Sequence, residues 1–373
     1  MHSADVIVVG GGSFGAAVAY GLVRQGVDTV ILDGSDDSLR AARGNFGLVW
    51  VQSKGMGLQR YADWSRESSH LWTDFANDLQ DSAGIHVNYQ NGGGLNLLLS
   101  EEERENCRRS IDIMRQQAGP DGYDAEIIER DEVQKMVPGL RVGDEVAGAS
   151  FGPHDGHANP LRLLRALHRG FEHRGGRYFA QNEVVSITHD GSAFVAQTAN
   201  DRFVAPKIVI ACGHGITKLA PMVGLNAPIR PQRGQVLVTE RIETTVEMAL
   251  GSIRQTDEGG FMFGNSEEEV GFNDGTTLPT AGNIAARAVK AFPQLSGVRL
   301  VRNWGCIRVL TPDKCAIYDE SETMPGAYVA TSHSGVTLAA VNAHHVANWV
   351  ATGDTPPGFD HFSARRFDVP AAA

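Results

Sequence analysis

Glycines near the start of the chain stand at the spacing that a phosphate-binding turn requires. Gly10, Gly12 and Gly15 follow an apolar run over 5–9, which predicts a buried strand. In such a turn the first glycine permits a tight bend, the second lets a pyrophosphate approach the backbone, and the third lets helix and strand touch. The helix predicted over 16–25 would direct free N–H groups and its positive end at the phosphates.

An acidic residue completes this pattern. A second predicted strand over 29–32 ends directly before Asp33, whose carboxylate is placed to accept a ribose hydroxyl. The sequence therefore predicts a dinucleotide site, and the alternative is a glycine-rich turn with no ligand. The residues assigned to the site from this segment are Gly10, Gly12, Ser13, Phe14, Gly15, Asp33 and Gly34.

The composition favours a loop-rich α/β protein and excludes several functional classes. A chain of 373 residues with 42% hydrophobic residues and 43 glycines is long enough for two domains. A net charge of −11 argues against a nucleic-acid partner. No apolar stretch reaches the roughly 20 residues that span a bilayer, and the first strand begins too early for a cleaved signal. A cytoplasmic protein is therefore expected.

Cysteine and histidine spacings give no metal site. The 4 cysteines form no CxxC pair, so the chain has no zinc or iron–sulfur framework of its own and fits a reducing compartment. His154 and His157 have HxxH spacing, but they lie in a Gly/Pro-rich loop that fixes no common face. Structural or surface histidines are therefore favoured over a metal pair.

Nucleotide-type elements recur at the start, the middle and the end of the chain. This order predicts a discontinuous nucleotide-binding domain that carries an inserted, mostly antiparallel domain. Asn159 suits a helix N-cap and Pro160 the first helical position of a helix that ends near 174. Other expected helices cover 57–79, 101–117, 127–137, 284–292 and 335–351; a hairpin is expected over 182–198, and strands over 207–211 and 327–330.

Several segments together carry a family resemblance: 5–15 with Asp33, Val184-Val185, 209–213 (VIACG), 233–236 (RGQV), 304–313 (WGCIRVLTPD) and 330–338 (ATSHSGVTL). Their order resembles the D-amino-acid oxidase (DAO) family of FAD-dependent oxidoreductases, which includes glycine oxidase and the sarcosine oxidases. The resemblance implies an α/β fold with a discontinuous Rossmann-like FAD-binding domain and an inserted α+β substrate domain. The expected division is 1–82, 140–215 and 312–373 for FAD, and 83–139 and 216–311 for the substrate.

A narrower resemblance concerns residues 43–47 and 50–52. They are similar to the catalytic β subunits of bacterial heteromeric amine dehydrogenases, of the opine oxidase, hydroxyproline dehydrogenase and hydrogen cyanide synthase types. This similarity implies an iron–sulfur-containing partner subunit, with FMN in some assemblies. It leaves open an attachment to the inner membrane through those partners.

The family resemblance also implies the reaction. FAD-dependent oxidation of an amino acid or secondary amine would proceed by hydride transfer from Cα to flavin N5. The resulting imine hydrolyses to a keto acid plus an amine, or remains as a cyclic imine. An opine or an imino acid such as hydroxyproline is the favoured substrate. The alternatives are a sarcosine- or glycine-oxidase-like enzyme using O2, an NAD-dependent dehydrogenase and a non-catalytic FAD-binding subunit.

Arg308 and His333 are the catalytic candidates that the resemblance implies. A guanidinium fork suits a substrate carboxylate, although Val309 stands where the family has proline. His333 could influence protonation, but a structural histidine is an equal alternative. The turn over 334–337 would stabilise the negative charge of the reduced flavin. The remaining cofactor residues are Arg43, Gly44, Asn45, Phe46, Gly47, Val184, Val185, Ala211, Cys212, Gly213, Ser334, Gly335, Val336 and Thr337.

Cys306 raises the question of a covalent flavin. It stands seven positions before Asp313, the spacing of the flavin-linked cysteine in monomeric sarcosine oxidase. Cysteines are often small buried hydrophobic residues, so spacing alone supports a thioether poorly. Noncovalent FAD is the prediction, and the thioether stays as the alternative.

Overall fold

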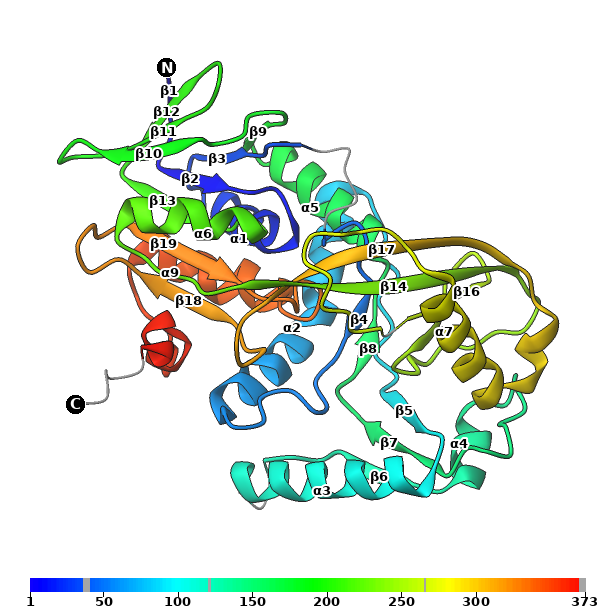
Figure 1. Cartoon of the computed structure of the whole chain (residues 1–373). Coiled ribbons are helices and arrows are strands. Elements are labelled where there is room, and N and C mark those ends of the chain that lie inside the picture. The colour runs from blue at the N-terminus through cyan, green and yellow to red at the C-terminus, as the bar shows by residue number, and fades with distance from the viewer. Residues whose placement is uncertain (36–40, 120–121, 265, 369–373) are drawn as a thin grey trace.

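The structure, a computed structural model, describes residues 1–35, 41–119, 122–264 and 266–368. Its largest sheet has six strands in the order β18-β19-β13-β2-β3-β9 and lies on the left of Figure 1. Neighbouring strands are parallel, except β18 with β19. The strands are β2 (Val6–Val9), β3 (Thr29–Leu32), β9 (Arg177–Phe179), β13 (Lys207–Ile210), β18 (Ile317–Glu320) and β19 (Ala327–Thr331).

The neighbouring interior strands β2 and β3 are short apolar runs in which every residue is buried. Parallel strands are covered on both faces, so continuous runs of Val, Ile and Leu suit them better than alternating patterns. Val8 lies opposite Ile31 on one side and Val209 on the other. The strands predicted over 5–9 and 29–32 are therefore confirmed.

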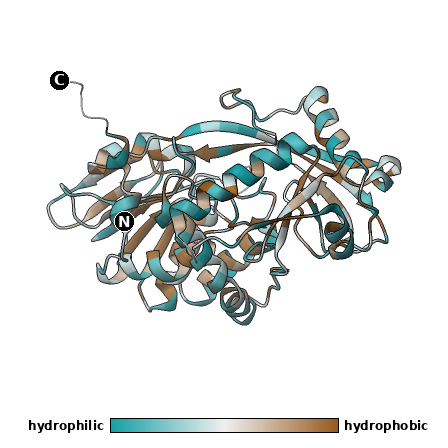
Figure 2. Ribbon diagram, turned by 90° about the horizontal axis from the view of Figure 1, so that it is seen from below, coloured by the Kyte–Doolittle hydropathy of each residue, from teal (hydrophilic) through white to brown (hydrophobic). Residues whose placement is uncertain are grey.

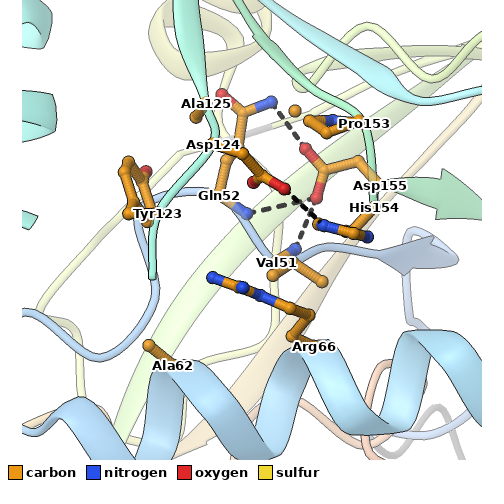
Figure 3. A pocket seen from close by; sticks show the side chains of 11 residues that line it. Val51, Gln52, Ala62, Arg66, Tyr123, Asp124, Ala125, Pro153, His154 and Asp155 are labelled. Carbon is orange, nitrogen blue, oxygen red and sulfur yellow. Dashed lines mark hydrogen bonds and ion pairs between the residues drawn. The ribbon is translucent and has the colours of Figure 1, made fainter. Parts of the chain in front are cut away.

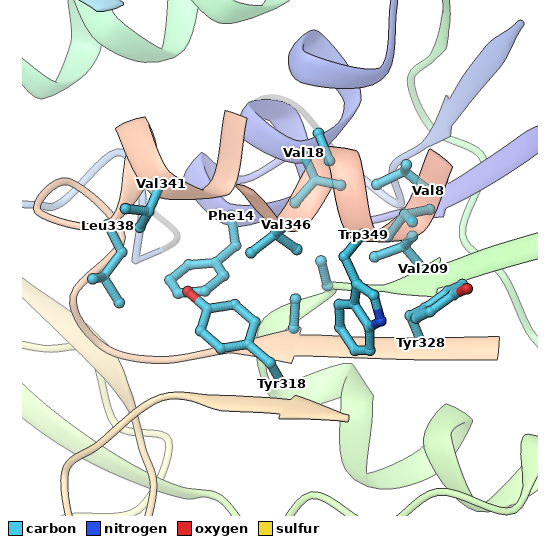
Figure 4. Packing of buried hydrophobic residues seen from close by; sticks show 14 of the residues in the cluster. Val8, Phe14, Val18, Val209, Tyr318, Tyr328, Leu338, Val341, Val346 and Trp349 are labelled. Carbon is cyan, nitrogen blue, oxygen red and sulfur yellow. The ribbon is translucent and has the colours of Figure 1, made fainter. Parts of the chain in front are cut away.

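The two faces of this sheet pack on different elements. Val6, Val8 and Ile31 point into a cluster with α1 and the C-terminal helices, which includes Tyr318 and Trp349 (Figure 4). Alternate residues of the same strands enter a second cluster with a smaller sheet. That sheet has the order β1-β12-β11-β10, with β1 (His2–Ser3), β10 (Ser186–His189), β11 (Phe194–Gln197) and β12 (Arg202–Ala205).

Helices surround the six-stranded sheet, and one of them begins as expected. Asn159 caps α5, and its Oδ1 accepts hydrogen bonds from Leu161 N at 3.2 Å and Arg162 N at 3.1 Å. The helices of this part are α1 (Ser13–Arg24), α2 (Gln59–Ala83), α5 (Pro160–His173), α6 (Ile216–Leu219), α8 (Ala339–Val341), π-helical η4 (Asn342–Val346), α9 (Ala347–Thr352), and the 3₁₀ turns η1 (Gly213–Gly215), η2 (Ala220–Val223), η5 (Phe359–Phe362) and η6 (Ala364–Phe367).

A second body, on the right of Figure 1, contains two antiparallel sheets. Their orders are β15-β16-β14-β17 and β5-β7-β6. The elements are β5 (Gly94–Leu98), β6 (Glu126–Ile128), β7 (Gly148–Gly152), β14 (Arg230–Arg241), β15 (Ile253–Gln255), β16 (Gly260–Phe263), β17 (Leu300–Leu310), α3 (Glu101–Ala118), α4 (Arg130–Met136), α7 (Leu278–Ala291) and η3 (Pro293–Gly297). Strands β4 (Leu48–Val49) and β8 (Gly156–His157) pair between the two bodies.

The long strands β14 and β17 extend from the second body to the first (Figure 1). They pair antiparallel, with Gln232 opposite Arg308 and Gly234 opposite Cys306. Figure 2 shows hydrophobic residues on the inner strands and hydrophilic residues on outer helices. The α/β fold with a Rossmann-like domain and a second, mostly antiparallel domain is thus confirmed. Among the described residues, no helix combines the length and apolar character needed to cross a membrane.

Three helix predictions need correction, the first because α7 begins at Leu278, before the expected start at 284. Residues 127–128 belong to β6, and α4 begins only at Arg130, because pairing with β7 captures the start of the segment. The last helix is expected from 335, but residues 335–338 form turns and α8 starts at Ala339. The hydroxyl and backbone groups of these turns bond to distant segments instead of an extended helix, as at Ser68 Oγ, which donates to Thr337 O at 2.6 Å.

Packing also bears on the expected domain boundary at 140. Leu140, Val142, Val146 and Ala149 lie in the hydrophobic cluster of the second body, together with β14 and β16 residues such as Phe261. We therefore propose that residues 140–152 belong to the substrate domain. The final residues of the expected third FAD segment, 369–373, lie outside the described residues.

Candidate functional site

A cavity of about 1130 Å³ opens at the carboxyl ends of the parallel strands and extends to β14 and β17. Gly10 follows β2, Asp33 follows β3, Ala211 follows β13 and Ser332 follows β19, and all four residues line it. This edge is where open α/β sheets bind their ligands, because the loops after adjacent strands diverge there and leave a crevice.

Most of the residues predicted for cofactor binding line this cavity. They are Gly10, Gly12, Ser13, Phe14, Asp33, Gly34, Gly44, Asn45, Phe46, Val184, Ala211, Cys212, Gly213, Ser334, Gly335, Val336 and Thr337. The two catalytic candidates, Arg308 and His333, line the same cavity. Segments from the start, the middle and the end of the chain therefore meet around one space.

The predicted residues Gly15, Arg43, Gly47 and Val185 are not part of the cavity lining that the structure describes. Gly15 instead packs α1 against the turn, since a Cβ there would lie 2.0 Å from Gly10 O. Gly47 N donates to the Asn45 side chain at 2.8 Å. Val185 is 41% exposed and its N–H donates to Gln197 O at 2.9 Å, because it continues the edge of the smaller sheet.

The nucleotide half of the cavity has the geometry that the glycine spacing predicts. Gly10 has φ +107°, and a Cβ there would lie 2.6 Å from Ala211 O, so only glycine fits between β2 and β13. Helix α1 begins at Ser13 without a side-chain cap, which leaves its first N–H groups for a ligand. Asp33 is buried, and its carboxylate accepts hydrogen bonds from Gly11 N at 2.8 Å and Ser35 N at 3.2 Å.

Arg308 brings a cation from β17 to the other half of the cavity. Its Nη1 donates to Ser266 O at 2.8 Å and Arg233 O at 3.4 Å. The carboxylate of Glu268 pairs with Arg233 at 2.8 Å, and none of the described residues supplies Arg308 with an ion-pair partner of its own. Burial lowers the pKa of Arg308, but an arginine remains charged. The site thus holds a cation that can bind a carboxylate.

His333 lies in the cavity directly after β19. Burial, and then the charges of Lys54, Arg308 and Lys314, lower its pKa to about 3. The imidazole is therefore neutral near pH 7, and it is a weak base. Its buried Nδ1 has no hydrogen-bond partner among the described residues. A buried polar atom of this kind needs a partner, which a bound ligand would supply.

Lys54 is a cavity residue that the sequence analysis missed. Its Nζ donates to Ser334 Oγ at 2.8 Å and to Thr337 Oγ1 at 3.0 Å, so the loop after β4 is tied to the turn after β19. Nothing in the local sequence distinguishes this lysine from a surface lysine in a loop. Only the distant hydroxyl groups at 334 and 337 reveal its place.

The loop that carries Lys54 is held by a buried carboxylate, Asp155, which the sequence analysis also missed (Figure 3). Asp155 accepts hydrogen bonds from Val51 N, from Gln52 N at 3.2 Å and from Gln52 Nε2 at 2.6 Å. Ser150 Oγ in turn donates to Gln52 Oε1 at 2.6 Å. Burial raises the pKa of Asp155 to about 7 against these hydrogen bonds.

The two histidines of the HxxH pair have separate partners. His154 Nε2 lies 2.6 Å from Asp124 Oδ2 and Nδ1 lies 3.2 Å from His70 Nε2, whereas His157 Nε2 lies 2.8 Å from Glu247 O. Among the described residues, no group of three or more His, Cys, Asp or Glu side chains is arranged to hold a metal ion.

Comparison with known proteins identifies the family. The family model described as "FAD dependent oxidoreductase" (DAO) matches residues 5–349. The chain belongs to this family. It is 40% identical to the B subunit of opine oxidase from Agrobacterium tumefaciens (strain Ach5) and 39% identical to the B subunit of opine oxidase from Rhizobium meliloti. Both alignments cover 100% of this chain and 100% of the relative.

A solved structure supports the same fold. Glycine oxidase from Bacillus cereus ATCC 14579 matches with a TM-score of 0.85 and 22% identity, over 98% of this chain and 99% of that one. At this identity the likeness concerns the fold. With its family, the chain is an FAD-dependent oxidoreductase that acts on carbon–nitrogen donors.

The residues of the cavity fit FAD. The uncapped start of α1 offers donors for a pyrophosphate, and Asp33 offers an acceptor for a ribose hydroxyl. The cavity then continues to Arg308 and to His333, whose Nδ1 has no partner within the described part of the chain, and the reacting end would lie there. A volume of about 1130 Å³ leaves space for a cofactor and a small substrate together.

We expect Asp33→Asn to weaken FAD binding by about 10- to 100-fold, because a hydrogen bond to a charged group contributes roughly 1.5–3 kcal/mol. Titration of the apoprotein with FAD, followed by flavin fluorescence, measures the change. Asp28→Asn, at the opposite end of β3, is the matched control, since Asp28 pairs with Arg177 outside the cavity. Equal FAD affinity in the two variants would contradict the assignment of Asp33.

Proposed function

We propose that this chain oxidises an amino acid or a secondary amine whose carboxylate is held by Arg308. The observation that carries the proposal is the shared cavity. The dinucleotide cradle at Gly10 and Asp33 lines the same continuous space as Arg308, a cation that forms no ion pair with any residue the structure describes. A carboxylate bound by Arg308 would therefore hold its substrate beside the reacting end of the cofactor.

For the substrate class we propose an opine or an imino acid such as hydroxyproline. The support is the full-length identity of 39% and 40% to two proteins that are each named as the B subunit of an opine oxidase. An opine is a secondary amine that carries a carboxylate on its oxidisable carbon. Such a substrate offers Arg308 the bidentate acceptor that a guanidinium binds best.

The roles of the chain's own residues follow from the site. FAD, when bound, supplies the acceptor for a hydride from the substrate Cα. Arg308 would bind the carboxylate and orient that carbon. His333 is neutral, so it does not repel a protonated amine, and its Nδ1 is available for a hydrogen bond to ligand. The imine then hydrolyses to a keto acid and an amine, or persists when it is cyclic.

We also propose that the chain works beside another subunit. The support is that both opine oxidase relatives are named as one subunit of an enzyme, the B subunit. A partner that carries an iron–sulfur cluster, or FMN bound with it, would pass the electrons onward. We propose a cytoplasmic assembly, with attachment to the inner membrane through the partner as the alternative. Purification of the chain together with the proteins that bind it, followed by metal and flavin analysis of the complex, tests this assembly.

We expect the FAD to be noncovalent. Cys306 is buried, its Sγ lies 3.9 Å from Ala41 O, and burial raises its thiol pKa to about 11, so little reactive thiolate forms near pH 7. Acid precipitation of the purified protein should leave the yellow flavin in the supernatant. Colour in the washed pellet that is lost in Cys306→Ser would establish the thioether instead.

The function is tested by anaerobic bleaching of the bound flavin. The panel contains D- and L-hydroxyproline, proline, sarcosine, glycine, octopine and nopaline. We expect bleaching by an opine or an imino acid, because those substrates carry the carboxylate that Arg308 binds. Fast reoxidation by air would favour the O2-using alternative, whereas slow reoxidation favours a partner as acceptor. Bound FAD that no member bleaches, even with the partner present, would support a non-catalytic role.

We expect Arg308→Ala to lower kcat/KM by about 30-fold or more, since loss of a buried charge partner costs roughly 2–5 kcal/mol. The effect should appear mainly in KM, because the carboxylate is bound in both the ground state and the transition state. Arg302→Ala is the control, as Arg302 lies on the same strand but is exposed. Unchanged turnover by Arg308→Ala would contradict the proposed role.

A further inference from the structure

Lys54 is a charged cavity residue that the reaction described above does not use. It lies in the loop between β4 and α2 and lines the cavity with Arg308 and His333. An ammonium group has three N–H donors. Two of them are directed at Ser334 Oγ and Thr337 Oγ1, at 2.8 Å and 3.0 Å, so one donor remains for a ligand.

The charge of Lys54 is balanced only in part by the residues that the structure describes, through the more distant carboxyl of Asp155. None of the described residues forms an ion pair with its Nζ, and the carboxyl of Asp155 is occupied by Val51 and Gln52. Burial lowers the pKa of Lys54 to about 7 although the charge of Asp155 opposes this change. A desolvated cation without an anion is costly, and a bound anion relieves that cost. Lys54 is half-buried, and the part of its side chain that remains exposed faces the cavity.

The position of Lys54 is built by a buried network. Asp155 holds the backbone of the preceding residues, and Gln52 Nε2 also donates to Gly94 O at 3.1 Å. Figure 3 shows Asp155 directed at Val51 and Gln52 above α2. A loop fixed by so many buried hydrogen bonds presents its lysine in one place, as a specific binding residue requires.

Lys54 and Arg308 act on the same imidazole. Both residues line the cavity with His333, although one comes from the loop after β4 and the other from β17. Lys54 Nζ lies 2.8 Å from Ser334 Oγ, and that hydroxyl lies 3.5 Å from His333 Nε2. After burial, the charges of Lys54, Arg308 and Lys314 lower the pKa of His333. The ligand expected beside His333 therefore meets two cations, neither of which has an ion-pair partner among the described residues. Two anionic groups on one ligand would satisfy both.

We propose that Lys54 binds a second carboxylate, so that the preferred substrate is a secondary amine with a carboxylated carbon on each side of its nitrogen. The proposal rests on the proposed function and specifies its substrate. Arg308 holds the carboxylate of the carbon that is oxidised, and Lys54 holds the other. Oxidation would transfer a hydride from that carbon to FAD and a proton from nitrogen to water, which leaves a C=N bond. Water then adds to that carbon, and the C–N bond breaks to give an α-keto acid and a primary amino acid. The carboxylate bound by Lys54 does not react, and it becomes the carboxylate of the amino-acid product.

The test uses two substrates that differ by one carboxylate, N-(1-carboxyethyl)alanine and N-ethylalanine. We expect Lys54→Met, in the FAD-loaded protein, to lower kcat/KM for the dicarboxylate by about 10- to 100-fold, the loss of one charged hydrogen bond. The monocarboxylate should change less than about threefold, within the spread of a neutral substitution. Lys54→Arg keeps the charge and should retain most of the discrimination. Lys135→Met, on exposed α4, is the control.

A binding measurement tests the role of Lys54 without requiring that the enzyme turn over a substrate. Oxydiacetate and methoxyacetate have an ether oxygen in place of the amine and cannot be oxidised in this way. Calorimetry should show oxydiacetate binding more tightly to the wild-type protein, and Lys54→Met should abolish that preference. Thermal unfolding of each variant identifies any that fails to fold. If Lys54→Met fails, the preference for oxydiacetate is compared between Lys54→Arg and the wild-type protein instead.

Two outcomes would overturn the proposal. An equal loss with both substrates, accompanied by a changed flavin midpoint potential, would show that Lys54 serves FAD and not the substrate. Retained discrimination in Lys54→Met would show that the second carboxylate lies elsewhere. Neither outcome would contradict the proposed oxidation of an amine by this chain. That reaction fails only if no amine reduces the flavin of the wild-type protein, and the ether analogues would still report on Lys54 in that case.

Discussion

One hydroxyl group joins the parts of the chain that enclose the cavity. Thr337 Oγ1 accepts hydrogen bonds from Trp50 N at 3.1 Å and Lys54 Nζ at 3.0 Å, and it donates to Leu48 O at 3.3 Å. The loop after β4 and the turn after β19 are thereby held together, although as many as 289 positions separate the bonded residues. The place of Lys54 in the cavity, beside Ser334 and His333, depends on this contact.

Burial then determines the charges of the site. Lys54 and Arg308 lose solvent without forming an ion pair among the described residues. Burial first, and then the charges of Lys54, Arg308 and Lys314, keep the imidazole of His333 neutral. Beside His333 the cavity therefore presents cations in a region of low dielectric, where an anion is bound strongly. Substrate recognition and the protonation state of the imidazole therefore have one physical origin.

The long strands β14 and β17 determine where Arg308 lies relative to the nucleotide-binding half of the cavity. Strand β17 carries Arg308 from the antiparallel sheet to the edge of the parallel one, and β14 supports it residue by residue. His214 Nε2, just after β13, lies 3.1 Å from Arg308 O and ties that strand to the nucleotide domain. A change in how the two bodies pack would move the carboxylate-binding group relative to the cofactor, so their packing is part of the site.

Local patterns in the sequence determined the elements whose geometry depends on neighbouring residues. The glycines from Gly10 to Gly15 predicted the strand, turn and helix, and Asn159 predicted the start of α5. The family motifs further predicted the residues from distant segments that line the cavity. Only the tertiary structure decided that Lys54 lines the cavity, that residues 140–149 pack in the second body and that the last helix begins at Ala339. The reason is physical: backbone geometry follows from consecutive residues, whereas burial and hydrogen bonding depend on partners that are remote in sequence.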